Sequence, residues 1–254
     1  MTAHLAIVDL VKHFGGVVAT DHVTLDFEPG SLTAVIGPNG AGKSTLFNLI
    51  TGRIRPDGGQ VLLDGVDIAG LAETAIVARG IGRAFQIASL FPSFTVAESL
   101  AAAILAHRRQ THRMLTRFPL AAARSRADEV MHLVGLDAHA DRLAQHLSHG
   151  DQKLLDIAMA LALDPGVLLL DEPTAGMGRD ERWQIIETVH RLWSARRMTM
   201  IFIEHDMDIV FKIAQSVRVL KYGRVLAEGT PEEIRDNDEV IAAYLGARYA
   251  KAAP

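Results

Sequence analysis

The stretch GPNGAGKS at residues 37–44 constrains the fold of this chain more than any other feature. It fits the pattern G-x-x-x-x-G-K-[ST] and stands between a predicted strand at residues 32–36 and a predicted helix at residues 44–50. Glycines let the backbone turn tightly with its N–H groups directed at phosphate oxygens, and the N-terminus of the helix adds positive potential. The alternative is a glycine-rich turn with a chance Lys-Ser pair, which the strand–loop–helix context argues against.

The loop predicts a nucleotide site with a divalent cation. Lys43 places an ammonium group on the β- and γ-phosphates, and the hydroxyl of Ser44 is a ligand for Mg²⁺. The residues expected to contact the nucleotide in this region are Gly37, Pro38, Asn39, Gly40, Ala41, Gly42, Lys43, Ser44 and Thr45.

A pair of carboxylates follows a second apolar run, VLLLDE at residues 167–172. A continuous apolar run is typical of a strand that is buried on both faces of a parallel sheet, and ligands bind at the carboxyl edge of such sheets. Asp171 is therefore a candidate ligand for Mg²⁺, and Glu172 is a candidate general base for an attacking water. Taken alone, the two acids are equally consistent with a cap on the turn before Pro173.

Two further polar residues follow predicted strands, at residues 81–85 and 200–203. The amide of Gln86 can contact Mg²⁺ and the attacking water, and His205 can form a hydrogen bond with the γ-phosphate. By itself, each residue is better explained as an ordinary polar residue at the end of a strand.

The remaining pattern predicts an α/β protein. Strands are expected at residues 22–27 and 60–63, helices at residues 181–196 and from residue 207, and a hairpin over residues 217–227. Residues 95–160 are rich in alanine and leucine, which favours a helical insertion into the α/β core.

Composition excludes several classes of protein. With 254 residues, the chain suits one large domain or a core with a subdomain. Its net charge of −4 gives no support for a nucleic-acid partner, and the absence of cysteine excludes disulfides and thiolate metal sites. No apolar run approaches the ~20 residues that span a bilayer. If the protein functions at a membrane, we expect it to dock on another protein that lies in the membrane.

These segments occur in a specific order: GPNGAGKS, Gln86, LSHGDQK at residues 147–153, VLLLDE and His205. The order resembles that of the ATP-binding subunits of ABC transporters over nearly the whole chain. The resemblance implies a Mg-dependent ATPase with a P-loop NTPase fold: a RecA-like core, an antiparallel β subdomain, and an α-helical subdomain inserted at about residues 87–160. Residues 1–254 would form a single ABC ATPase domain.

Residues 147–153, the signature segment, resemble the LSGGQ motif of that family. Ser148 and Gly150 match the serine and second glycine, which bind the γ-phosphate held by another subunit, so the resemblance implies a second ATPase chain, identical or different. His149 and Asp151 depart from the motif, and a carboxylate at residue 151 is unfavourable beside a phosphate unless it points away. Phe14 matches the aromatic residue that stacks on adenine, with a core aromatic as the alternative.

A second departure follows the carboxylate pair. The family commonly continues with S-A-L-D, whereas this chain has residues 175–178 as AGMG. The missing aspartate leaves its contact to the other subunit in question, and Asp180 is a candidate substitute.

Three segments look most like the ATPase subunits of branched-chain amino-acid importers: residues 14–52, HDMDIVFKIA and GRVLAEGTPEEI. The resemblance implies transmembrane permease partners, an indirect link to a periplasmic or extracellular binding protein, and a peripheral location on the cytoplasmic face of the membrane. Residues 89–100, with Phe91 and Phe94, are the expected docking region for the permease. The alternatives are an ATPase for lipid or lipopolysaccharide export and a soluble, non-transport ABC ATPase; without an N-K-x-D string, a P-loop GTPase is the least favoured.

Overall fold

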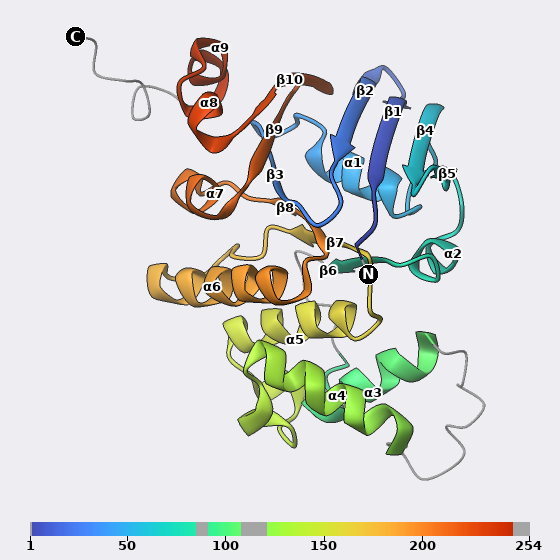
Figure 1. Cartoon of the computed structure of the whole chain (residues 1–254), viewed down its shortest axis with the longest axis vertical. Helices are drawn as coiled ribbons and strands as arrows, with labels where there is room; N and C mark the ends of the chain where they lie inside the picture. The colour runs from blue at the N-terminus through green and yellow to red at the C-terminus, as the bar shows by residue number, and fades with distance from the viewer. Residues whose placement is uncertain (1, 85–90, 108–120, 246–254) are drawn as a thin grey trace.

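The computed structural model describes residues 2–84, 91–107 and 121–245, which form two sheets and a group of helices (Figure 1). The larger sheet has the strand order β10-β9-β3-β8-β7-β6. All of its strands are parallel except β10, which forms an antiparallel hairpin with β9. The strands are β3 (Leu32–Ile36), β6 (Ile81–Ala84), β7 (Val167–Asp171), β8 (Thr199–Ile203), β9 (Ser216–Lys221) and β10 (Arg224–Gly229).

The central strands of this sheet explain why the sequence reads as apolar runs. Every residue of β3, β7 and β8 is buried, because both faces of the sheet are covered. Parallel alignment brings the carboxyl ends of β7 and β8 to one edge, beside the loop that follows β3. The predicted strands at residues 32–36, 167–170 and 200–203 and the predicted hairpin are confirmed.

The smaller sheet is antiparallel, with the strand order β2-β1-β4-β5. Its strands are β1 (Leu5–Phe14), β2 (Val17–Phe27), β4 (Gly58–Leu63) and β5 (Val66–Asp67). The predicted strand at residues 22–27 is the second half of β2. Strand β1 was not predicted from the sequence. Its pairing register shifts between Ile7 and Leu10, where Asp9 has a φ of 53°, and this bulge breaks the alternation of apolar residues.

Helix α1 (Lys43–Ile50) joins the two sheets in one core. Its Phe47 packs in a buried cluster with Ile7 of β1 and with Val35 and Ile201 of the larger sheet. The loop at residues 37–44 is therefore anchored at both ends, by β3 and by a helix that is buried between the sheets.

Helices α3, α4 and α5 pack against one another on one side of the larger sheet, and they lie at the bottom of Figure 1. The predicted helical region is confirmed within these helices, whereas residues 135–148 form a connection with two 3₁₀ turns.

Among the described residues, no helix has the length and apolarity needed to cross a bilayer. The helices are α2 (Glu73–Val77), α3 (Val96–His107), α4 (Ala121–Val134), α5 (His149–Leu161), α6 (Arg179–Arg196), α7 (Met207–Ile213), α8 (Pro231–Arg235) and α9 (Asp238–Val240).

Candidate functional site

The loop at residues 37–44 requires glycine for steric reasons. Gly37 has a φ of 146°, and a Cβ atom there would lie 2.1 Å from the carbonyl oxygen of Leu220. Gly42 has a φ of 102°, and its added Cβ would lie 2.3 Å from the carbonyl oxygen of Ala19. Neighbouring backbone therefore encloses the loop on two sides, and side chains at these positions would force it out of shape.

Lys43 is the first residue of α1 and is buried. Its Nζ donates hydrogen bonds to the carbonyl oxygens of Gly37 (2.7 Å) and Pro38 (3.0 Å). Burial lowers the pKa of Lys43, and the nearby carboxylates of Glu172 and Asp171 act in the opposite direction. The carboxylate pair therefore lies close enough to the loop to act on the charge of its lysine.

A cavity of about 230 Å³ opens beside this loop. Glu172 and His205, which follow β7 and β8, line the cavity together with the loop residues. The structure thus brings together three segments that the sequence places far apart. The lining residues are Val17, Val18, Ala19, Asn39, Gly40, Ala41, Gly42, Lys43, Ser44, Thr45, Glu172 and His205.

Glu172 and His205 are in direct contact. The Oε1 of Glu172 lies 2.8 Å from the Nε2 of His205, which is hydrogen-bond distance. Glu172 has a φ of 47°, an uncommon conformation for a residue with a side chain, and its N–H donates to the carbonyl oxygen of Ile203. Backbone strain at a residue that faces a cavity supports a functional role for it.

Asp171 forms a buried ion pair that was not expected from the sequence. Its Oδ2 lies 2.6 Å from the guanidinium of Arg83 on β6, and the same guanidinium donates to the Oδ1 of Asn48 in α1 at 2.8 Å. Arg83 therefore connects the carboxyl ends of β6 and β7 to α1. A charged residue within a predicted strand, IGRAF, was the signal that could have identified it.

The signature segment begins α5, with Ser148 as the N-cap residue. The Ser148 hydroxyl accepts a hydrogen bond from the Asp151 N–H (3.1 Å) and lies 2.7 Å from the Asp151 carboxylate, to which it donates. The N–H of Gly150 donates to the Oε1 of Glu181 in α6 at 2.8 Å. The carboxylate of Asp151 therefore faces the hydroxyl of Ser148. Ser148 and Gly150 do not line the cavity of their own chain.

The structure does not place three other predicted residues in the cavity. Phe14 lies at the end of β1, with 46% of its surface exposed, and is not one of the residues that line the cavity. Asp180 is an exposed residue in the first turn of α6. Gln86 lies outside the described residues.

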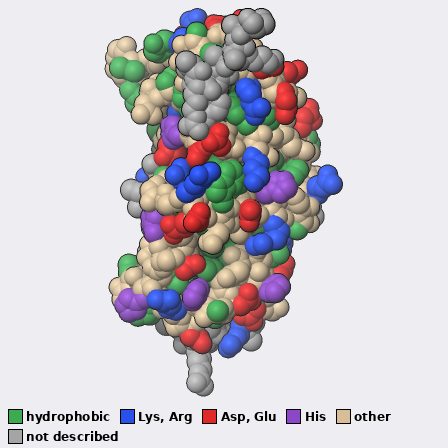
Figure 2. All heavy atoms as spheres, turned by 90° about the vertical axis from the view of Figure 1, so that its left-hand side faces the viewer, with side chains coloured by type: hydrophobic (Ala, Val, Ile, Leu, Met, Phe, Trp, Pro, Cys, Tyr) green, Lys and Arg blue, Asp and Glu red, His purple; other side chains and the backbone are tan. Residues whose placement is uncertain are grey.

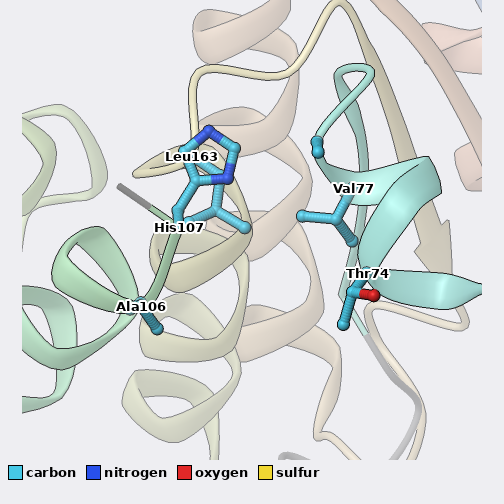
Figure 3. A pocket seen from close by; sticks show the side chains of 7 residues that line it. Thr74, Val77, Ala106, His107 and Leu163 are labelled. Carbon is cyan, nitrogen blue, oxygen red and sulfur yellow. The ribbon is translucent and has the colours of Figure 1, made fainter. Parts of the chain in front are cut away.

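A second cavity, of about 500 Å³, has no contribution from the loop or from the carboxylate pair. Figure 3 shows Thr74 and Val77 of α2 on one side, with Ala106 and His107 of α3 and Leu163 on the other. Its walls are mainly apolar, which suits contact with a protein surface better than phosphate chemistry.

The fold and the first cavity define a class of protein. A parallel sheet that delivers a phosphate-binding loop, an acid and a histidine to one cavity is the arrangement of a P-loop nucleotide triphosphatase.

Comparisons with known proteins identify the family within this class. The family model "ABC transporter" matches residues 20–175, and "Branched-chain amino acid ATP-binding cassette transporter" matches residues 224–250. The chain is 38% identical to the high-affinity branched-chain amino acid transport ATP-binding protein LivG of Escherichia coli (strain K12), over 95% of this chain and 97% of LivG. It is 39% identical to the corresponding protein BraF of Pseudomonas aeruginosa, with the same coverage. The chain belongs to the ABC transporter family, in which it is an ATP-binding cassette.

Solved structures confirm the predicted fold. The ADP conformation of MJ1267, an ATP-binding cassette of an ABC transporter, has a TM-score of 0.85 and 30% identity, and the match covers 97% of this chain and 100% of MJ1267. The dimeric post-hydrolysis state of the cassette MJ0796, bound to ADP and Pi, has a TM-score of 0.76 and 25% identity, over 89% of this chain and 98% of that one.

Proposed function

We propose that this ATPase powers the import of branched-chain or other hydrophobic amino acids through membrane permease subunits. The relatives LivG and BraF carry branched-chain amino acid transport in their names and match nearly the whole chain. The observation that carries the hydrolytic part of the proposal is the 2.8 Å contact between Glu172 and His205 inside the cavity of the phosphate-binding loop.

In the proposed complex, backbone N–H groups within residues 39–45 and the N-terminus of α1 surround the phosphates of ATP. The ammonium of Lys43 exchanges its contacts with the carbonyl oxygens of Gly37 and Pro38 for contacts with the β- and γ-phosphates. Phe14 is the proposed stacking partner of adenine, and its exposure leaves the ring accessible.

The residues present fit a magnesium ion. Ser44 and Asp171 offer a hydroxyl and a carboxylate, the hard oxygen ligands that Mg²⁺ prefers, and Gln86 is the third proposed contact. When bound with ATP, Mg²⁺ neutralises charge on the β- and γ-phosphates. Arg83 holds the carboxylate of Asp171 in place through their buried ion pair.

Hydrolysis requires a base near the γ-phosphate. Glu172 accepts a proton from water as the water oxygen attacks the γ-phosphorus, and the bond to the bridging oxygen of ADP breaks. His205 donates a hydrogen bond to the γ-phosphate and, through its contact with Glu172, orients the base.

The signature segment supplies the other half of each site. The hydroxyl of Ser148 and the N–H of Gly150 bind the γ-phosphate held by a second ATPase chain, identical or different, in a head-to-tail dimer. ATP thereby closes the dimer, and hydrolysis removes the phosphate that joins the two chains.

The permease docks on apolar surface of the ATPase at the cytoplasmic face of the membrane. Phe91 is 45% exposed, and its ring stacks on that of Phe94 with 5.1 Å between the centroids. The apolar cavity between α2 and α3 offers a second candidate surface (Figure 3).

Two variants test the ATPase mechanism. Glu172→Gln should bind ATP and form stable dimers in gel filtration while hydrolysing ATP at least about 100-fold more slowly, because the amide cannot accept the proton. Lys43→Ala should lose nucleotide binding in a fluorescence titration. Normal turnover by Glu172→Gln would remove Glu172 from the mechanism.

Transport is tested by reconstitution. The chain, its second ATPase chain and its permease in proteoliposomes should take up radiolabelled leucine in an ATP-dependent manner when the binding protein is added. Uptake that does not respond to branched-chain or other hydrophobic amino acids would overturn the assignment of substrate, without affecting the ATPase assignment.

A further inference from the structure

A group of buried charged residues lies beside the catalytic pair and is not used in the mechanism above. Glu204 follows β8 and is 3% exposed, and Lys153 in α5 is 4% exposed. Asp156, one turn along α5 from Lys153, is 5% exposed. Because burial of charge is costly, such residues need compensating contacts.

The carboxylate of Glu204 bridges the segments that carry Glu172 and His205. Its Oε1 accepts hydrogen bonds from the hydroxyl (2.6 Å) and the N–H (3.1 Å) of Thr174, two residues after Glu172. Its Oε2 accepts a hydrogen bond from the N–H of His205 at 3.2 Å. One side chain therefore connects the ends of β7 and β8 at the point where each delivers a functional residue.

Lys153 supplies positive charge to this region from the signature helix. Burial lowers its pKa, whereas the carboxylates of Asp156, Asp171, Glu204 and Glu172 favour its charged form. Its Nζ lies 3.5 Å from the carbonyl oxygen of Asp171. The helix that begins with Ser148 thus places an ammonium, little more than one turn later, beside the carbonyl that precedes Glu172.

From these contacts we infer that Glu204 is a positioning residue that holds Glu172 and His205 together. The inference rests on the roles proposed for Glu172 and His205.

The backbone explains why the pair needs such a support. Glu172 is held in a left-handed conformation, and a strained residue persists only where its surroundings fix it. Its own N–H is fixed by the carbonyl oxygen of Ile203, and the turn that follows is fixed by Glu204 through Thr174. If the carboxylate were lost, the turn and the His205 N–H would both lose an acceptor inside the protein.

Glu204→Gln tests this positioning role with little change in size. The amide keeps one oxygen for Thr174, but its NH₂ group cannot accept a hydrogen bond from the His205 N–H. We expect kcat for ATP hydrolysis to fall by about tenfold or more, with KM for ATP within about twofold and ATP-dependent dimerisation retained, because only the geometry of the pair is disturbed. Glu228→Gln removes a more exposed carboxylate on β10 that pairs with Arg218, and serves as the matched control with unchanged kcat.

The outcome separates this inference from the proposed function. If Glu204→Gln hydrolyses ATP at the normal rate while Glu172→Gln does not, the positioning role is overturned and the ATPase mechanism stands. If Glu172→Gln also hydrolyses ATP normally, the mechanism itself fails.

A double variant separates positioning from simple structural support. Lys153→Met leaves buried carboxylates without their ammonium and should lower the melting temperature. Adding Glu204→Gln removes one of these carboxylates, so the double variant should melt at a higher temperature than Lys153→Met. Its kcat should remain as low as that of Glu204→Gln; recovery of kcat together with stability would show that Glu204 supports only the fold.

Discussion

At the scale of single residues, left-handed backbone conformations mark both sides of the nucleotide cavity. Gly37, Gly40 and Gly42 have positive φ values on the loop side, and Glu172 has one on the opposite side. Glycine adopts this conformation at little cost, whereas a residue with a side chain does so at a cost of about 1–2 kcal/mol. The chain therefore uses glycine where we propose that phosphate approaches the backbone, and accepts strain where we propose that an acid faces the phosphate.

The loop side gives a direct test of this geometry. Gly37→Ala places a Cβ atom 2.1 Å from the carbonyl oxygen of Leu220, so unfolding free energy should fall by more than about 3 kcal/mol, and ATP binding should be lost. Gly65→Ala is the matched control: Gly65 has a φ of 79° and no atom within 4 Å of an added Cβ, so about 1–2 kcal/mol is expected from the conformation alone. Urea denaturation measures both, and equal losses would contradict the steric explanation.

Glu204 makes stability depend on pH in a predictable direction. Burial raises its pKa above the ordinary value of 4.5, and the hydrogen bonds from Thr174 and His205 oppose this only in part. Between pH 4.5 and the raised value, the folded chain keeps a proton that the unfolded chain has lost, so the free energy of unfolding decreases as pH rises. Glu204→Gln has no carboxyl group to titrate at this position. The free energy of unfolding of the original chain minus that of the variant should therefore fall between pH 4.5 and the raised pKa. Urea denaturation at successive pH values measures this difference. A difference that does not change with pH would contradict the raised pKa.

At the scale of elements, the first turn of α5 meets the first turn of α6. The N–H of Gly150 donates to the carboxylate of Glu181, and the hydroxyl of Ser148 donates to that of Asp151. Both donors proposed to bind the partner chain's γ-phosphate are therefore engaged by carboxylates of their own chain. Closing the dimer requires an exchange of one anion for another at the N-terminus of α5.

We expect Glu181→Gln to favour the dimer. A neutral amide holds the Gly150 N–H less strongly and does not repel the incoming phosphate, so the ATP concentration for half-maximal dimerisation should fall about fivefold, equivalent to about 1 kcal/mol. Gel filtration in the Glu172→Gln background, where dimers persist, measures this, and Glu187→Gln on the exposed face of the same helix is the control. Weaker dimerisation would show that Glu181 supports the signature segment instead of competing with the nucleotide.

The elements also show what sequence patterns can and cannot reveal. The apolar run before Asp171, the loop at residues 37–44 and the hairpin around Gly223 were predictable because each is a local pattern with a local cause. Strand β1 was missed because a bulge at Asp9 interrupts its alternation. Contacts such as Gly150 with Glu181 join residues 31 positions apart on different helices, and no spacing rule links them.

At the scale of the whole molecule, the face seen in Figure 2 is mixed in charge, with acidic, basic and histidine side chains interspersed. Charges of both signs side by side screen one another, so this face does not favour a partner of one charge. We therefore expect a permease to be recognised through local apolar contacts, for which exposed aromatic side chains are the first candidates.

We expect a substitution of Phe91 to weaken binding of the permease. Its ring is 45% exposed and stacks on Phe94, so a charge at this position would place an unpaired carboxylate in an apolar interface. Phe91→Glu should reduce copurification with the permease at least about tenfold, because losing a central aromatic contact costs roughly 1.4 kcal/mol or more. ATP binding by the isolated chain should be unchanged. Val66→Glu alters a 57% exposed apolar residue on β5, in the antiparallel sheet, and should copurify normally. Full copurification of Phe91→Glu would exclude this surface from the permease interface and leave the cavity between α2 and α3 as the site to test.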